Sequence, residues 1–306
     1  MKGMTEMNCS EKSGVPSAGA AWKRFAKMVF DILLFLFVFL LTYSVLGLLF
    51  SVFFAEEGGA GQQWLTVIDE LLLLLASLFS AWLVLRMRGL PFSALGLHFR
   101  GYAKDWCRGM LFAVALYAIG FGVSLLAGSV EVVSVSFRPD SLLVSLVFFA
   151  IVAFFEELTL RGFVLGRMLD SGMNKFLALF LSSVLFSLFH FANPDFSVLP
   201  FLNILLAGMM LGASYIYTRN LSFPIAVHWF WNWLQGPVLG YEVSGIRFGE
   251  SLLNLRLSAN EWMNGGDFGF EGSLLCTLLL IAGTLIIMKM ESGKWRMDNG
   301  ELRMDN

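Results

Sequence analysis

Eight long apolar runs dominate this sequence, and they restrict the chain to one class of fold. An α-helix needs about 20 apolar residues to cross a hydrocarbon layer roughly 30 Å thick. Hydrophobic residues make up 57% of the 306 residues and charged residues only 14%, whereas a soluble domain carries about 25% charged residues. We therefore predict an all-α polytopic membrane protein with about eight transmembrane helices. The predicted spans are 29–54, 67–85, 109–130, 142–165, 176–192, 198–217, 222–240 and 272–290, of which 176–192 is the shortest.

The basic residues between these runs are distributed unevenly. Short cytoplasmic connections of membrane proteins are enriched in Lys and Arg. Starting from the N-terminus, alternate connections hold 18 of the 21 basic residues, and the other connections hold only Arg138, Arg247 and Arg256. The connections of the basic set are 1–28, 86–108, 161–175, Arg219 and 289–306. We expect a multi-pass protein of the cell (plasma) membrane, with both termini in the cytoplasm and an even number of spans.

The order of polar and apolar segments predicts how the chain is organised. The first 25 residues are polar and contain no cleavable apolar core, which indicates a cytosolic tail rather than a signal peptide. The motif RMDN occurs twice near the C-terminus and predicts a disordered end. The predicted segments are a cytosolic tail (1–28), N-terminal transmembrane helices (29–130), a core with polar motifs (140–240), an extracytoplasmic loop (241–271), a last transmembrane helix (272–290) and a cytosolic tail (291–306).

Two further features exclude other classes of protein. Cys9, Cys107 and Cys276 are scattered, which argues against a disulfide framework and against a CxxC-type metal site. The formal net charge is −2, and the sequence has no basic stripe of the kind that binds nucleic acid. We therefore expect no nucleic-acid partner.

One apolar run, AFFEELTLRGF, carries three charged residues, Glu156, Glu157 and Arg161. A charged side chain at the centre of a bilayer costs about 3 kcal/mol on insertion scales, so such residues need either a partner or a function. Residues four apart share a face of a helix, so Glu157 and Arg161 can form an ion pair. Glu156 points about 100° away and is left without this partner.

Two later runs place polar residues at the same four-residue spacing. FSLFH contains Phe186 and His190, and HWFWN contains His228 and Asn232. Their distances along the helices put all of them inside the hydrocarbon layer, together with Glu156. The chain has three histidines, and two of them lie here. We expect these side chains to converge on one water-filled cavity.

Each of these residues also has a purely structural interpretation. Glu157 and Arg161 could act only as a clamp, and His190, His228 and Asn232 could act as hydrogen-bonding partners between helices. Phe186 belongs to a chain with 31 phenylalanines, which favours a packing role. The third histidine, His98, is expected at the membrane surface.

The three motifs together resemble the CPBP family of intramembrane proteases, which includes CaaX prenyl proteases, Abi proteins and bacteriocin-immunity proteins. The residues that carry the resemblance are EExxxR at 156–161, FxxxH at 186–190 and HxxxN at 228–232. The resemblance covers about 140–240, and LGLHFR at 95–100 is similar to the family's lead-in to its third helix. Because no motif position departs from the family pattern, the resemblance implies a competent peptidase.

The resemblance implies a role for each motif residue. Glu156 would be the general base, and His190 would hold the water and shuttle its proton. His228 and Asn232 would donate hydrogen bonds to the oxyanion of the tetrahedral intermediate. Glu157, Arg161 and Phe186 would hold the catalytic side chains in this geometry without contacting the substrate.

The cofactor and the class of function leave alternatives open. Glu156, His190 and His228 could bind zinc as three ligands, and the family has been labelled as metalloproteases, but the sequence has no HExxH motif and we favour a mechanism without metal. The expected partners are the lipid bilayer and a membrane-associated peptide or protein substrate. A non-catalytic scaffold or immunity factor is a second candidate, and a transporter is a third, although we find no internal repeat of the transporter kind.

Overall fold

The computed structural model describes residues 18–54, 62–293, 295–298 and 301–304, and it confirms the all-α polytopic class. The α-helices are α1 (Ala18–Phe54), α2 (Gln62–Met87), α3 (Ala103–Leu126), α4 (Pro139–Glu157), α5 (Gly166–Asp170), α6 (Lys175–Phe189), α7 (Val198–Thr218), α8 (Ser222–Trp233), α9 (Glu261–Asn264) and α10 (Leu274–Ser292). The π-helices are η2 (Leu158–Leu165) and η3 (Leu234–Val238), and the short 3₁₀ helices are η1 (Phe92–Leu95), η4 (Gly266–Phe268) and η5 (Phe270–Gly272). The strands are β1 (Val130–Val135), β2 (Leu253–Leu257), β3 (Trp295–Asp298) and β4 (Glu301–Met304).

All eight predicted apolar runs are helical over most of their length, but the predicted end of the third run at 130 was wrong, because α3 ends at Leu126 and strand β1 begins at Val130. Six helical segments of the described chain are long and apolar enough to cross a membrane, namely Gly19–Val52, Gln63–Met87, Ala103–Leu126, Pro139–Asp170, Val198–Thr218 and Leu274–Ser292. Helix α6 has 15 residues and α8 has 12, which is shorter than a full span. The predicted boundary of the fifth run was wrong, because α6 ends at Phe189 and His190 is its C-terminal cap rather than a helical residue.

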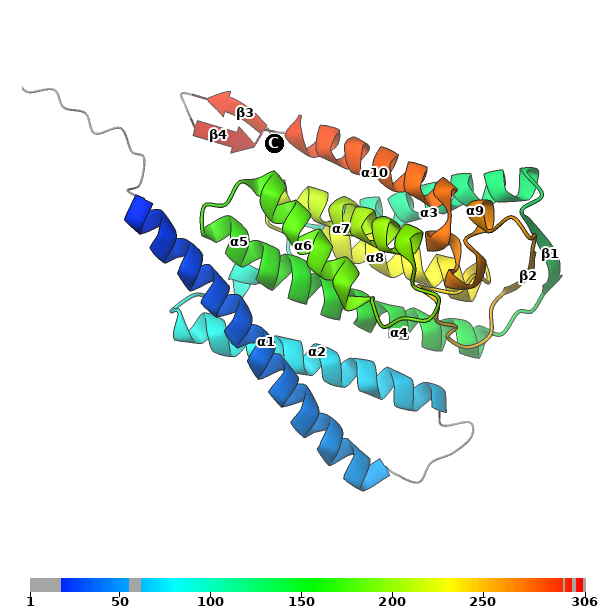
Figure 1. Ribbon diagram of the computed structural model, residues 1–306, viewed down its shortest axis with the longest axis horizontal. Helices are drawn as coiled ribbons and strands as arrows, with labels where there is room; N and C mark the ends of the chain where they lie inside the picture. Colours follow the sequence, from blue (N-terminus) through cyan, green and yellow to red (C-terminus); the bar gives the residue numbers. More distant parts are fainter. Residues whose placement is uncertain (1–17, 55–61, 294, 299–300, 305–306) are drawn as a thin grey trace, which may run out of the picture.

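The helices run back and forth along one axis, so that alternate connections gather at opposite ends of the molecule (Figure 1). The beginning of α1, the end of α2, α5 and the β3–β4 hairpin lie at one end. Strands β1 and β2 and helix α9 lie at the other end. The connections with many basic residues therefore share one end of the bundle, as the charge distribution requires.

Small residues let the core helices approach each other closely. A Cβ atom on Gly208 of α7 would lie 2.9 Å from the Cβ of Ser183 on α6, and a Cβ on Gly109 of α3 would lie 2.7 Å from the carbonyl oxygen of Phe223 on α8. Any larger residue would push these helices apart, since core packing leaves no free volume of this size. Close contact between α6 and α7 positions the backbone carbonyl of Gly208 for the polar site described below.

The segment predicted as a loop, 241–271, is a folded part of the structure. Its strand β2 pairs antiparallel with β1, with Val130 opposite Leu257, and its later part forms α9, η4 and η5. The C-terminal end that contains the two RMDN copies is described only in part. Strands β3 and β4, which contain most of the two RMDN copies, form an antiparallel hairpin, while Asn299 and residues 305–306 lie outside the described residues.

Candidate active site

A change of helix type marks the position of the two glutamates. Helix α4 ends at Glu157, and the chain continues without a break as the π-helix η2. π-helical turns inside α-helices are rare and frequently occur at functional sites. Two tryptophans of α8 hold this helix against α4, since Trp229 Nε1 donates to the carbonyl of Leu146 (2.9 Å) and Trp233 Nε1 donates to that of Leu142 (3.2 Å).

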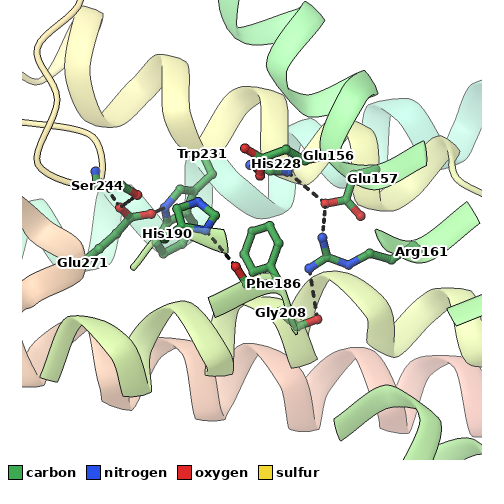
Figure 2. Close-up of polar contacts among 10 residues, drawn as sticks. All are labelled: Glu156, Glu157, Arg161, Phe186, His190, Gly208, His228, Trp231, Ser244 and Glu271. Carbon is green, nitrogen blue, oxygen red and sulfur yellow. Dashed lines mark hydrogen bonds and ion pairs between the residues drawn. The ribbon is translucent and has the colours of Figure 1, made fainter. Parts of the chain in front are cut away.

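The buried ion pair between Glu157 and Arg161 is present. Arg161 Nη1 lies 2.8 Å from Glu157 Oε1, and the exposed fractions of the two side chains are 1% and 0%. Arg161 Nη2 also donates to the carbonyl of Gly208 on α7 at 3.2 Å (Figure 2). The guanidinium therefore links η2 to α7 while it neutralises Glu157.

His228 lies between the two adjacent glutamates. Its Nδ1 is 2.9 Å from Glu157 Oε1, and its Nε2 is 3.7 Å from Glu156 Oε2. A carboxylate accepts hydrogen bonds, so Nδ1 carries a proton and only Nε2 remains available to the cavity. Arg161, Glu157, His228 and Glu156 thus form a continuous chain of alternating charge when the imidazole is protonated.

Phe186 separates His190 from this chain. Its ring centre lies 4.2 Å from the guanidinium carbon of Arg161, 4.8 Å from the ring of His190 and 6.0 Å from the ring of His228. His190 Nδ1 is 2.8 Å from the carbonyl oxygen of Phe186. Because a carbonyl oxygen only accepts, Nδ1 is the protonated nitrogen and Nε2 is free to accept a proton.

A small inner cavity of about 30 Å³ lies among these side chains. Its wall includes Glu156, His190, His228, Asn232 and Phe186. One water molecule needs roughly 10–15 Å³ measured in this way, together with two to four polar partners. The structure therefore brings all four predicted polar residues to one space that can hold a water molecule.

A larger cavity of about 540 Å³ adjoins the inner one. Glu156, His190 and Asn232 belong to the walls of both, and most of the larger wall is apolar and comes from α1, α2, α4 and the segment 243–248. Glu70 of α2 also lies on this wall. A cavity of this size and character is typical of a site for an apolar ligand.

Several residues on these walls were not predicted from the sequence. Trp231, Ser244 and Glu271 lie on the inner cavity, and Glu70 lies on the outer one. Glu70 carried a usable signal, since it is a carboxylate in an apolar run and satisfies the criterion that selected Glu156. Glu271 directly precedes the last apolar run, but its contact with the cavity depends on the folding of 241–271. The remaining histidine, His98, is exposed, as predicted.

Among the residues that the structure describes, no three side chains of His, Cys, Asp or Glu are close enough together to hold a metal ion. His190 and His228 each use Nδ1 for a hydrogen bond, to Phe186 and to Glu157 respectively. In this geometry Glu156, His190 and His228 do not converge as a set of zinc ligands.

The helical fold thus contains a cavity lined by glutamate, histidine and asparagine side chains from apolar helices. Residues 138–234 match the family model described as type II CAAX prenyl endopeptidase, Rce1-like. These residues are therefore similar to that family, which is a family of peptidases. The matched residues include all three motifs and end shortly after Asn232.

No curated protein and no solved structure matches the chain at a significant level. The family match and the apolar helices together identify a multi-pass membrane protein with an intramembrane peptidase core similar to CAAX proteases. Such a core acts at the bilayer on a membrane-associated substrate.

The two adjacent glutamates should differ in their effect on stability. Glu157→Gln leaves Arg161 without a charged partner in a buried site, and breaking a buried pair costs about 3–5 kcal/mol. Glu156→Gln removes a carboxylate from the cavity wall, and it loses only the longer 3.7 Å contact with His228 and no ion pair with Arg161. We expect thermal unfolding in detergent to occur at a clearly lower temperature for Glu157→Gln, and at an unchanged or higher temperature for Glu156→Gln. Equal melting temperatures for the two variants would contradict this assignment.

Proposed function

We propose that this protein is an intramembrane endopeptidase in which Glu156 and His190 activate the attacking water. The observation that carries the proposal is the shared inner cavity, in which Glu156, His190, His228 and Asn232 surround a space large enough for one water molecule. Peptide hydrolysis needs an activated water, a proton carrier and donors for an oxyanion. These four side chains supply all three.

Glu156 and His190 have different roles in moving the proton of the attacking water. Glu156 takes a proton from the water as the water attacks the peptide carbonyl carbon, and the same proton is later delivered to the leaving amine. His190 keeps its Nδ1–H on the carbonyl of Phe186, so its Nε2 can orient the water by accepting a hydrogen bond. The general base is thereby separated from the group that positions the water.

The oxyanion is stabilised from α8. The Asn232 side-chain amide donates one hydrogen bond, and His228 donates another from Nε2 when the imidazole is protonated. Glu157 accepts from Nδ1 of His228 and from Arg161, and it thereby stabilises the imidazolium and fixes its orientation. Donors held in position before the reaction lower the barrier more than donors that must reorganise.

The outer cavity is proposed to hold the apolar part of the substrate. Its volume of about 540 Å³ and its aromatic and aliphatic wall suit a prenyl group or an apolar peptide segment. The family name refers to prenylated CAAX proteins, and a substrate of this kind would place its apolar group there and its peptide bond at the inner cavity.

We further propose that both termini face the cytoplasm. The connections rich in Lys and Arg share one end of the bundle (Figure 1), and such connections remain in the cytoplasm. Reporter fusions after Arg88, Lys175 and Arg219 should read cytosolic, and a fusion near Asn260 should read external. A cytosolic signal from the fusion near Asn260, together with external signals from the others, would reverse the proposed orientation in the plasma membrane.

The proposed mechanism uses no metal ion. The support for this is that no set of three metal ligands forms among the described side chains and that the sequence lacks an HExxH motif. Elemental analysis of active, purified protein should give well under one zinc per chain, and chelators should leave the cleavage rate unchanged. Stoichiometric zinc that is lost together with activity would refute this part of the proposal.

Substitution of the base and of its partner histidine tests the peptidase proposal. Glu156→Gln retains the size of the side chain but removes the basic oxygen, and general base catalysis contributes roughly 10²–10⁴ in rate. We expect Glu156→Gln and His190→Ala to lower kcat by this order, measured on membrane-bound reporter peptides that include a prenylated CAAX peptide. The exposed His98 gives a matched control, and His98→Ala should leave kcat unchanged.

The same variants separate an enzyme from a scaffold. If folded Glu156→Gln and His190→Ala proteins keep the full biological activity of the wild type, the function does not depend on hydrolysis. The peptidase proposal would then fail, and a scaffold or immunity function would take its place.

A further inference from the structure

Glu271 is a buried carboxylate on the inner cavity that lies outside the three motifs. Its side chain accepts three hydrogen bonds, from Trp231 Nε1 (3.0 Å) to Oε1 and from the backbone N (3.0 Å) and Oγ (2.8 Å) of Ser244 to Oε2 (Figure 2). Asn203 of α7 holds the backbone, since its Nδ2 donates to the carbonyls of Glu271 (2.7 Å) and Ser273 (2.9 Å). Glu271 is 4% exposed. Glu271 therefore connects α7, α8 and the segment after η3, and its own backbone is held in place by Asn203.

Ser244 occupies a backbone conformation that serine rarely adopts. Val243 and Ile246 exchange backbone hydrogen bonds of 2.9 Å across a two-residue turn. The central residues of the turn, Ser244 and Gly245, have φ values of 50° and 80°, and a turn with two positive φ values favours Asn-Gly. A strained serine persists only where the surroundings hold it. The two hydrogen bonds from Ser244 to Glu271 provide this constraint.

The turn is in direct contact with the segment that follows His190. Asn193 Nδ2 donates to the carbonyl of Ser244 at 3.0 Å, and Asn193 N donates to the carbonyl of His190, also at 3.0 Å. Next to this contact, a Cβ atom on Gly245 would lie 2.3 Å from the carbonyl oxygen of Pro194. The turn thus abuts two consecutive residues, 193 and 194. A connected path runs from Glu271 to the backbone of His190.

We propose, resting on the peptidase function above, that Glu271 is a positioning residue for the hydrolytic cavity. Its carboxylate holds Ser244 and Trp231 in the wall of the inner cavity, and through Asn193 it keeps His190 in place beside the water. His190 needs this support because it lies beyond the end of α6, where no further helical turn fixes it. The segment 241–271, which lies outside the matched family region, is therefore part of the active-site wall.

The first test measures the path itself and does not depend on catalysis. Amide hydrogen exchange is followed by mass spectrometry on the full chain in lipid nanodiscs, for peptides covering 190–196, 241–248 and α10. Glu271→Gln replaces an acceptor oxygen by an NH₂ group opposite N–H donors, and hydrogen bonds to a charged group are among the stronger ones. We expect exchange to accelerate roughly tenfold or more at both 190–196 and 241–248, with α10 unchanged.

A matched control removes the same charge from the same segment. Glu242 forms an ion pair with Arg247, whose side chain is exposed, and lies outside both cavity walls. Glu242→Gln should leave exchange at 190–196 and the cleavage rate at wild-type values. Ser244→Gly provides a milder change, because it removes one hydrogen bond to Glu271 and at the same time eases the positive φ.

The second test is kinetic. A positioning role predicts that Glu271→Gln lowers kcat on the reporter peptides by about tenfold or more, while KM changes by less than about twofold, because the substrate still binds but the water is misplaced. Ser244→Gly should lower kcat by a smaller factor in the same direction. A purely structural role for Glu271 would lower the amount of folded protein without changing kcat per folded molecule.

The outcomes separate this proposal from the peptidase function. If Glu271→Gln is folded and either the exchange at 190–196 or kcat equals the wild-type value, the proposal is overturned. If Glu271→Gln does not accumulate, exchange at 190–196 and kcat are measured for Ser244→Gly instead, and wild-type values of either one overturn the proposal. If the wild type hydrolyses no peptide, the peptidase function fails, and faster exchange at 190–196 in Glu271→Gln still decides whether Glu271 holds His190.

Discussion

The structure depends on a buried carboxylate, Glu157, that binds an arginine and a histidine at once. Arg161 and His228 both bind Oε1 of Glu157, and these two residues belong to η2 and α8. Arg161 extends the connection to α7 through the carbonyl of Gly208. An unpaired charge at this depth would be costly, so the packing of these three elements and the satisfaction of the charges stabilise each other. The ion pair also fixes which nitrogen of His228 faces the cavity.

The two cavities divide the work that the proposed reaction requires. The inner one is small and polar and accommodates a water molecule, whereas the outer one is large and apolar and suits a lipid-like group. Glu156, His190 and Asn232 lie where the two meet. In the proposed reaction the water lies in the inner cavity, where it has several polar partners. The apolar part of the substrate lies in the outer cavity, apart from the water.

The motif residues could be identified from the sequence because the free-energy cost of a charged side chain in a membrane is apparent whatever its partners are. Glu156, Glu157 and Arg161 stand out in an apolar run, and the i, i+4 spacing of Glu157 and Arg161 predicts their pairing. The same reasoning extended the fifth run past His190, since apolarity alone does not show where a helix ends. The π-helix after Glu157 was also missed, because it depends on how η2 packs against its neighbours rather than on local propensity.

The sequence by itself determined the membrane class, the positions of the apolar helices and the identity of the polar motif residues, because each of these follows from the transfer cost of individual side chains into hydrocarbon. Only the tertiary structure decided that His228 bridges the two glutamates. It also decided that the segment 241–271 folds back to bring Glu271 and Ser244 to the cavity. These contacts join residues at least 27 positions apart, and no local pattern encodes which distant donor will meet which buried acceptor.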